Sequence, residues 1–253
     1  GTAQGRITAK VDPALLDIFF DDFQRENLFD QNWSAAEPSF YDIQRVGQSD
    51  LRMRVQGRKH PTLSPAILSA PFTALQFTFE FLLRYATGAQ GRMGIRTVND
   101  LGFFELVNPD GNQLFFQYRA RNGQFVQRQG LLGPGFGGRD IHVVIMSDAL
   151  HGIIRVQAFE GASLLSELAY SDGQTFSSPQ SWEIFAHTVS GAVIILDDVR
   201  VSDLLVNRAS ASGSGGAGLA TSEFNFVRVL RDSSALSATA TPTHSPTATE
   251  SGT

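Results

Sequence analysis

The segments FFDDF (residues 19–23) and LDDVRV (residues 196–201) match one another and mark the two ends of a β-rich region. Between them, apolar residues recur at every second position far more often than at every 3.6 residues, and Gly, Asn, Asp and Pro separate the runs. Alternation with a period of two is typical of strands that bury one face. We therefore predict an all-β fold from about Phe19 to Val206, with no sustained amphipathic helix.

The alternating runs predict strands over residues 17–23, 40–43, 51–55, 66–69, 75–85, 92–97, 103–107, 113–119, 125–131, 140–147, 152–159, 163–169, 181–186 and 192–202. The connections Asn108–Asn112 and Arg121–Gly123 supply residues that tolerate positive φ in tight hairpins. Short strands with such connections favour an antiparallel sandwich or barrel over parallel βαβ units.

Several segments, taken in order, resemble landmarks of the concanavalin A-like (laminin-G-like) lectin/glucanase superfamily. They are FFDDF (19–23) with Trp33, LRMRV (51–55), FTFEF (77–81), NDLGFFEL (99–106), residues 141–145, residues 156–161 and LDDVRV (196–201). Within the superfamily the chain most resembles bacterial domains of the 3-keto-disaccharide hydrolase type. The resemblance implies an antiparallel jelly-roll sandwich of two curved sheets, with the first and last strands side by side. It also implies recognition of glycans or surface polymers, with catalysis in some branches only.

The composition divides the chain into four parts. We predict a sandwich over residues 1–207, a Ser/Gly/Ala linker over 208–222, an isolated strand-like segment over 223–232, and a disordered Ser/Thr/Pro-rich tail over 233–253. Such tails commonly hold exported modules away from a surface, although the same composition also fits simple disorder. We expect an extracellular or cell-surface location.

Four carboxylates in the two matching segments need a common explanation. A buried carboxylate is costly unless it is hydrogen-bonded or bound to a metal, so these groups are either solvated or jointly satisfied. Neighbouring first and last strands would bring Asp22 close to Asp198. These groups can accept hydrogen bonds from the backbone or from an arginine such as Arg200, or Asp22 and Asp198 can hold Ca²⁺, the one cofactor that we consider.

The sequence lacks the paired carboxylates that glycosidases of this fold carry on one strand. Glu105 and Glu80 stand alone on their predicted strands, although they could face one another across a sheet, and they are the catalytic candidates if the protein is an enzyme. The histidines have no HExxH or HxH spacing and the chain has no cysteine, so we expect no zinc site.

Strand parity separates an inner face from an outer one, because residues two apart share a face. On the strand at 75–85 it directs Phe77, Phe79, Phe81, Leu83 and Tyr85 inward. On the strands that follow, it directs Ile95, Phe104, Leu106, Phe116 and Tyr118 inward. It leaves as outward ligand-binding candidates Arg84, Arg96, Phe103, Glu105, Phe115, Gln117 and Arg119. Aromatic rings stack on sugar rings, while planar Arg, Glu and Gln groups bond to hydroxyls. The alternative is a solvated face with cross-strand Arg–Glu pairs.

The net charge of −5 gives no basic field for nucleic acid, and no apolar run reaches the length of a membrane span. Our leading hypothesis is an exported, non-catalytic carbohydrate-binding or adhesion module on a cell-surface or secreted protein, with a glycan or surface polymer as partner. One alternative is a glycoside hydrolase or related sugar-active enzyme. The other is a structural subunit that self-associates when residues 223–231 add to the sheet edge of a neighbour.

Overall fold

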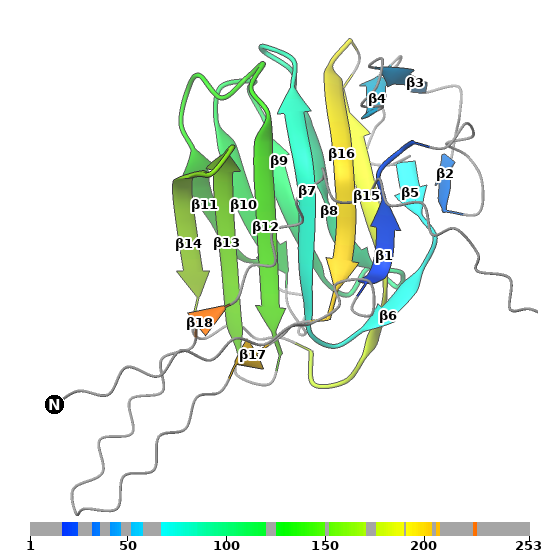
Figure 1. The fold of residues 1–253 in the computed structure, drawn as a ribbon, viewed down its shortest axis with the longest axis vertical. Coiled ribbons are helices and arrows are strands. Elements are labelled where there is room, and N and C mark those ends of the chain that lie inside the picture. Colours follow the sequence, from blue (N-terminus) through cyan, green and yellow to red (C-terminus); the bar gives the residue numbers. More distant parts are fainter. Residues whose placement is uncertain are drawn as a thin grey trace, which may run out of the picture. The chain divides into compact units, whose positions relative to one another are not determined.

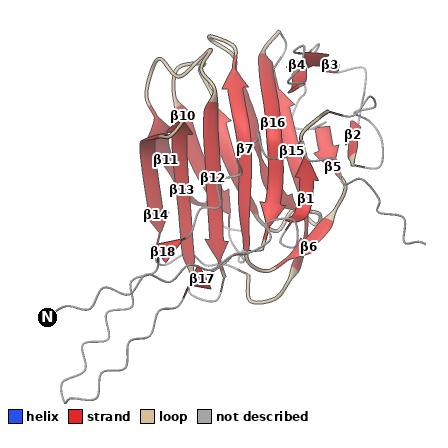
Figure 2. Ribbon diagram, in the orientation of Figure 1, coloured by secondary structure: helices blue, strands red, loops and turns tan. Residues whose placement is uncertain are grey.

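The computed structural model describes residues 17–24, 32–35, 41–46, 52–57, 67–119, 125–149, 152–170, 176–189, 191–203, 206–207 and 225–226. The secondary structure of this part of the chain is strand and turn, with no helix (Figure 2). It follows that no helix in these ranges could cross a membrane. The chain divides into two units, Gly1–Leu204 and Leu205–Thr253, each of which is described by itself.

The first unit consists of two eight-stranded antiparallel layers (Figure 1). Sheet A has the order β14 (Ser163–Tyr170), β13 (Ile153–Glu160), β12 (Ile141–Asp148), β7 (Phe77–Tyr85), β16 (Val193–Ser202), β4 (Arg52–Gly57) and β3 (Tyr41–Val46), and β1 (Asp17–Asp21) also pairs with β16. Sheet B has the order β11 (Phe125–Leu132), β10 (Leu114–Arg119), β9 (Phe103–Asn108), β8 (Gly91–Thr97), β15 (Gln180–Thr188), β5 (Ile67–Ser69) and β2 (Trp33–Ala35), and β6 (Phe72–Ala74) also pairs with β15. The prediction of an antiparallel jelly-roll sandwich is confirmed.

The first and last strands of the sandwich are neighbours, as the resemblance implied. Phe20 lies opposite Arg200 and Asp21 lies opposite Val199. Strand β4 pairs with the first half of β16, and β1 continues along its second half, past an irregularity between Asp197 and Arg200. The two matching segments therefore meet at one seam of sheet A.

Aromatic side chains from both layers fill the space between the sheets. The ring of Trp182, from β15, lies 5.2 Å from that of Phe77 on β7 and 5.7 Å from that of Phe104 on β9. At the other end of the sandwich, Tyr170 on β14 contacts Tyr118 on β10 with ring centroids 5.3 Å apart. Such rings contribute burial of apolar area and edge-to-face attraction. The inward residues predicted from parity are all buried.

Each of the fourteen predicted strands is present, with ends that differ by no more than three residues. The three-residue strands β2 and β6 were not predicted. The connection after β9 is the predicted turn: Gly111 has φ +80°, and its amide donates to the Asn108 side chain at 2.9 Å. The predicted turn at 121–123 lies outside the described residues.

The four described residues of the second unit form a short antiparallel pair. Strand β18 (Asn225–Phe226) pairs with β17 (Val206–Asn207), so two residues of the predicted strand-like segment find their partner within the same chain. The linker, the rest of that segment and the tail at 233–253 lie outside the described residues. Assembly with a neighbouring molecule through residues 223–231 stays a prediction.

Candidate functional site

The outer face of sheet B carries most of the predicted ligand-binding residues. Five adjacent strands, β15, β8, β9, β10 and β11, contribute to it, and their register places polar and aromatic side chains in rows. We call this surface the arginine face and define it by Arg92, Arg96, Phe103, Glu105, Phe115, Gln117, Arg119, Arg128, Glu183, Phe185 and His187. Its residues alternate along the strands with side chains that are buried between the sheets.

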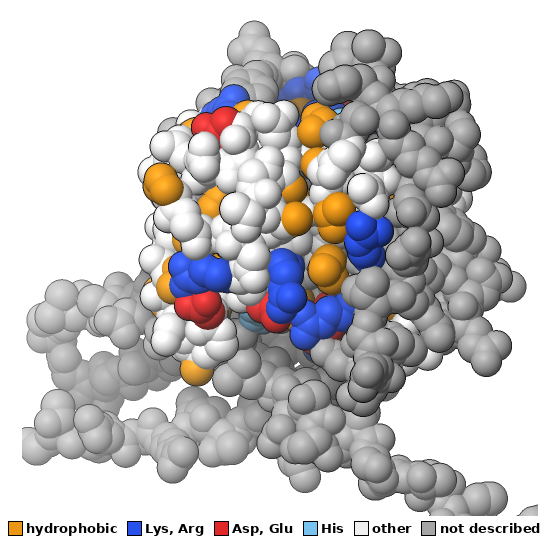
Figure 3. Space-filling model, turned by 90° about the horizontal axis from the view of Figure 1, so that it is seen from above, with side chains coloured by type: hydrophobic (Ala, Val, Ile, Leu, Met, Phe, Trp, Pro, Cys, Tyr) orange, Lys and Arg blue, Asp and Glu red, His pale blue; other side chains and the backbone are white. Residues whose placement is uncertain are grey.

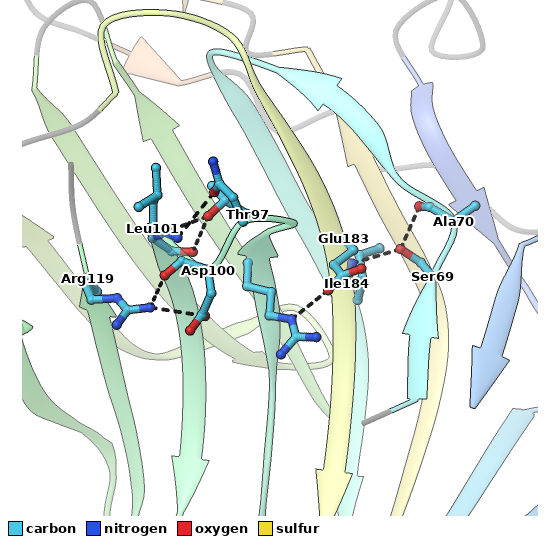
Figure 4. Close-up of polar contacts among 11 residues, drawn as sticks. Ser69, Ala70, Thr97, Asp100, Leu101, Arg119, Glu183 and Ile184 are labelled. Carbon is cyan, nitrogen blue, oxygen red and sulfur yellow. Dashed lines mark hydrogen bonds and ion pairs between the residues drawn. The ribbon is translucent and has the colours of Figure 1, made fainter. Parts of the chain in front are cut away.

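Two arginines of β8 converge on one ring. The guanidinium carbons of Arg92 and Arg96 lie 5.9 Å and 5.7 Å from the centroid of Phe185 on β15. Between them, Gly94 pairs with Phe185 and has no side chain to keep the two arginines apart. Arg96 also forms an ion pair with Glu183 at 2.7 Å, and Figure 4 shows Glu183 reaching toward its partner across the strands. Contacts of cations with ring faces are attractive, and they strengthen when water is excluded.

Two further arginines lie over rings at the other end of the face. Arg119 lies 5.1 Å from the centroid of Phe103 and forms an ion pair with Asp100 at 3.1 Å (Figure 4). Arg128, an exposed residue of β11, lies 4.3 Å from the centroid of Phe115. The face therefore presents repeated pairs of a flat cation and a flat apolar ring.

Glu105 is the most buried carboxylate of the arginine face and lies next to Arg92. Its side chain is 2% exposed, it accepts a hydrogen bond from Gln117, and one of its oxygens is 3.7 Å from Nη1 of Arg92. Burial raises the pKa of Glu105 above its ordinary value, although the charge of Arg92 and the hydrogen bond from Gln117 oppose the shift. A Cβ atom at Gly94 would lie 2.7 Å from the Cα of Glu105, so that position must be glycine for Glu105 to stay in place. Glu105 is placed to orient Gln117 and Arg92.

His187 lies next to Arg92 across the β15–β8 pairing. It is buried, and neither ring nitrogen has a hydrogen-bond partner among the described residues. Burial and the neighbouring charge of Arg92 lower the pKa of His187 to about 4, so the ring is neutral at pH 7. A buried neutral imidazole with no partner is costly, and each such group calls for an explanation.

Two candidates from the sequence do not belong to this face. Arg84 and Glu80 are on β7, which lies in sheet A, so they are on the opposite outer surface of the sandwich. Glu80 therefore cannot face Glu105 across a sheet, and the carboxylate pair considered for catalysis is not formed. Nε2 of His142 lies 3.4 Å from Glu80.

Arg84 is part of a network of ion pairs on sheet A. It donates two hydrogen bonds of 2.6 Å to Asp140. Arg52 forms ion pairs with both Asp140, at 3.1 Å, and Asp197, at 3.3 Å, and so connects the two carboxylates. Burial alone would raise the pKa of Asp140, but the hydrogen bonds from Arg84 and Arg52 outweigh it and lower the pKa below its ordinary value. Figure 3 shows acidic side chains lying directly against basic ones on the described surface. Through Asp140 and Arg52, Arg84 links β7 to β4 and to Asp197 on β16.

Asp21 and Asp197 are satisfied by contacts within the fold. Asp21, 1% exposed, accepts a 2.8 Å hydrogen bond from the Phe23 amide and one of 2.5 Å from the Trp33 indole. Asp197 accepts a 2.9 Å hydrogen bond from the Asp198 amide in addition to its contact with Arg52. These contacts match the structural role that the sequence left open.

Arg200 was the arginine expected to serve these carboxylates, and its Nε instead lies 3.4 Å from Asp17. The register of β1 and β16 ends at Asp21 and Val199, one residue before Asp22 and Asp198, and Asp198 has φ +47° within an irregular stretch of β16. Among the residues that the structure describes, no group of three or more His, Cys, Asp or Glu side chains could hold a metal. Calcium binding by Asp22 and Asp198 stays a prediction.

Sequence reasoning missed several members of the arginine face, namely Arg92, Arg128, Glu183, Phe185 and His187. The same parity that selected Arg96 on its strand also points Arg92 outward, so that residue could have been found. The three residues of β15 had no such signal, because β15 comes more than 80 residues after β8 in sequence and nothing local indicates that the two strands pair.

No family model matches the sequence, and no curated protein matches it. Among solved structures, a glycosyl hydrolase family protein from Mycobacterium fortuitum aligns with a TM-score of 0.52 and 15% identity over 73% of this chain and 99% of that one. The globular domain of T. cruzi calreticulin aligns with a TM-score of 0.52 and 9% identity over 75% and 88%. A sialidase aligns with a TM-score of 0.46 and 10% identity over 68% of this chain, which spans 17% of that longer protein. At these identities the likeness is one of fold.

Proposed function

We propose that the protein is an exported carbohydrate-binding module whose ligand lies on the arginine face. The observation that carries the proposal is the set of guanidinium groups lying on the rings of Phe185, Phe103 and Phe115 along one outer sheet surface. Sugar recognition combines apolar contact with a ring face and directional bonds to hydroxyls. The partly exposed rings of Phe103 and Phe115, with the planar donors of Arg119 and Arg128 beside them, supply both kinds of contact.

The glycosyl hydrolase family protein among the solved structures supports a glycan-related role, because it shares the fold over most of both chains. Fold alone does not fix function, so the surface chemistry carries the proposal. The resemblance to the concanavalin A-like superfamily and the stalk-like composition of residues 233–253 support the placement outside the cell.

The test is retention of the full chain on insoluble polysaccharides and in polysaccharide-containing native gels. Arg96→Ala and Arg119→Ala should each reduce retention at least tenfold, because each removes a cation that lies against a ring. The matched control is Arg155→Ala, since Arg155 is a partly buried arginine of β13 in the other sheet. If the wild type binds none of a broad set of polysaccharides, the proposal is wrong.

A sugar-active enzyme is the second candidate, and the burial that raises the pKa of Glu105 favours it, because general acids of glycosidases are carboxyl groups whose pKa is raised in this way. A release of reducing sugar that Glu105→Gln abolishes would establish it. Activity that survives this substitution would remove Glu105 from any catalytic role.

A further inference from the structure

The charges on the arginine face are unevenly compensated. Arg96 and Arg119 have carboxylate partners, Glu183 at 2.7 Å and Asp100 at 3.1 Å. Within the described ranges, the carboxylate that pairs with Arg92 is Glu105, at 3.7 Å, which is long for a hydrogen-bonded ion pair.

Arg128 has Phe115 against it and no carboxylate partner in the part of the chain that the structure describes. Among the residues that the structure describes, Arg128 therefore has no carboxylate partner and Arg92 has a distant one, although the chain as a whole carries a net charge of −5. Such a contrast favours an anionic ligand at this surface.

The two under-compensated arginines are well separated. Arg92 is on β8 and Arg128 is on β11, with β9 and β10 between them. Three strand spacings of about 4.8 Å put them roughly 14 Å apart across the sheet. A single small anion cannot reach both, whereas an extended chain with repeated negative groups can.

The ring contacts indicate what such a ligand carries besides its negative groups. Phe115, beside Arg128, is partly exposed, whereas Phe185, beside Arg92, is only 4% exposed, so the apolar surface open to a ligand lies at Arg128. A ligand that carries apolar ring faces between its charges uses both features, and a bare inorganic polyanion uses only one.

His187 gives an independent indication beside Arg92. Its two ring nitrogens are buried, without a partner among the described residues, on the ligand side of sheet B. A neutral imidazole offers one donor and one acceptor. A hydroxyl group of a ligand bound at Arg92 would form a hydrogen bond with one of these ring nitrogens. In the unbound protein the nitrogen lacks that bond, which costs free energy.

From these contacts we infer that the ligand is an acidic polysaccharide, whose carboxylate or sulfate groups bind Arg92 and Arg128 while a sugar ring lies along the partly exposed Phe115. This inference rests on the proposed function and names its substrate class. Carboxylated and sulfated chains share the chemistry that the face recognises, and the experiment separates them.

The experiment measures binding of the full chain by calorimetry to polygalacturonate, to dextran sulfate and to neutral dextran, at low and at high salt. At least one acidic polymer should bind ten times more tightly than dextran, with an affinity that falls as salt screens the charges. Arg92→Gln and Arg128→Ala should each lower that affinity at least fivefold, and Arg155→Ala on sheet A should leave it unchanged. Arg128 is exposed, so its variant remains informative if Arg92→Gln does not fold.

The outcomes separate the two levels of the proposal. If dextran and the acidic polymers bind equally well and Arg96→Ala reduces both, the ligand is not specifically acidic, and the proposed glycan binding still holds. Binding of the acidic polymers that neither Arg92→Gln nor Arg128→Ala weakens would overturn the inference. Binding of duplex DNA as tight as that of the acidic polysaccharides would also overturn the inference, because the face would then recognise negative charge and not a sugar. No binding of any polymer would overturn both levels.

Discussion

The protonation of His187 should make the fold sensitive to mild acid. Its pKa is lowered from 6.5 to about 4, first by burial and then by the charge of Arg92. In the unfolded chain the imidazole takes up a proton near pH 6.5, while in the folded protein it stays neutral down to about pH 4. The stability that depends on the neutral form is therefore complete above pH 6.5 and is lost as the pH falls toward 4.

The size of this loss follows from the shift. Each pKa unit corresponds to about 1.4 kcal/mol, so the full effect is roughly 3 kcal/mol and the loss between pH 7 and pH 5 is about 2 kcal/mol. Glu105 acts in the opposite direction, because a raised carboxyl pKa stabilises the fold at low pH and costs free energy as the pH rises. A comparison with a His187 variant removes this background, because Glu105 is present in both proteins.

The assay is urea unfolding of the wild type and His187→Gln at half-unit steps from pH 7 to pH 4. Trp33 and Trp182, 2% and 1% exposed, report the loss of the core through their fluorescence. The free energy of unfolding of the wild type should fall about 2 kcal/mol further than that of His187→Gln by pH 5. His142→Gln, on sheet A, controls for loss of an imidazole elsewhere. Parallel pH profiles for the wild type and His187→Gln would show that His187 is not buried as a neutral group.

Three further predictions concern the seam, the close approach of two strands and the sheet A network. Asp21→Asn should lower the free energy of unfolding by about 1–3 kcal/mol, because the Phe23 amide and the Trp33 indole lose a charged acceptor, while Asp22→Asn should change it by less than about 0.5 kcal/mol in the same urea titration. Gly94→Ala should cost about 1–3 kcal/mol through its clash with β9, measured against Gly133→Ala, where a Cβ meets nothing within 4 Å; equal effects would contradict the close approach. Arg84→Ala should destabilise the protein by about 0.5–1 kcal/mol, because the Arg84–Asp140 pair is partly exposed, yet leave polysaccharide retention unchanged. Loss of retention in the folded variant would return Arg84 to the ligand-binding set.

Local patterns were sufficient to predict the strands and their buried sides. The inward positions of β7 follow from a period of two that needs no knowledge of partners, and all five are at most 1% exposed. Sheet membership is different, because it depends on the path of the chain. Strands β7 and β8 are consecutive and close in sequence, but the connection between them passes from sheet A to sheet B. Parity alone therefore grouped Arg84 with Arg96, although the two lie on opposite surfaces.

Local sequence patterns also cannot distinguish a binding surface from an ordinary solvated face, whereas the contacts of each arginine can. A solvated face with cross-strand pairs would match each arginine to a carboxylate, and each exposed pair would contribute about 0.2–1 kcal/mol. Arg96 with Glu183 fits that description, but Arg128 does not, because its contact is with Phe115 and no carboxylate pairs with it in the described residues. Removing the Arg128 side chain should therefore cost little stability, and any large effect should appear in polymer binding. A surface arginine with that combination of effects is retained for what it binds, since the fold does not depend on it.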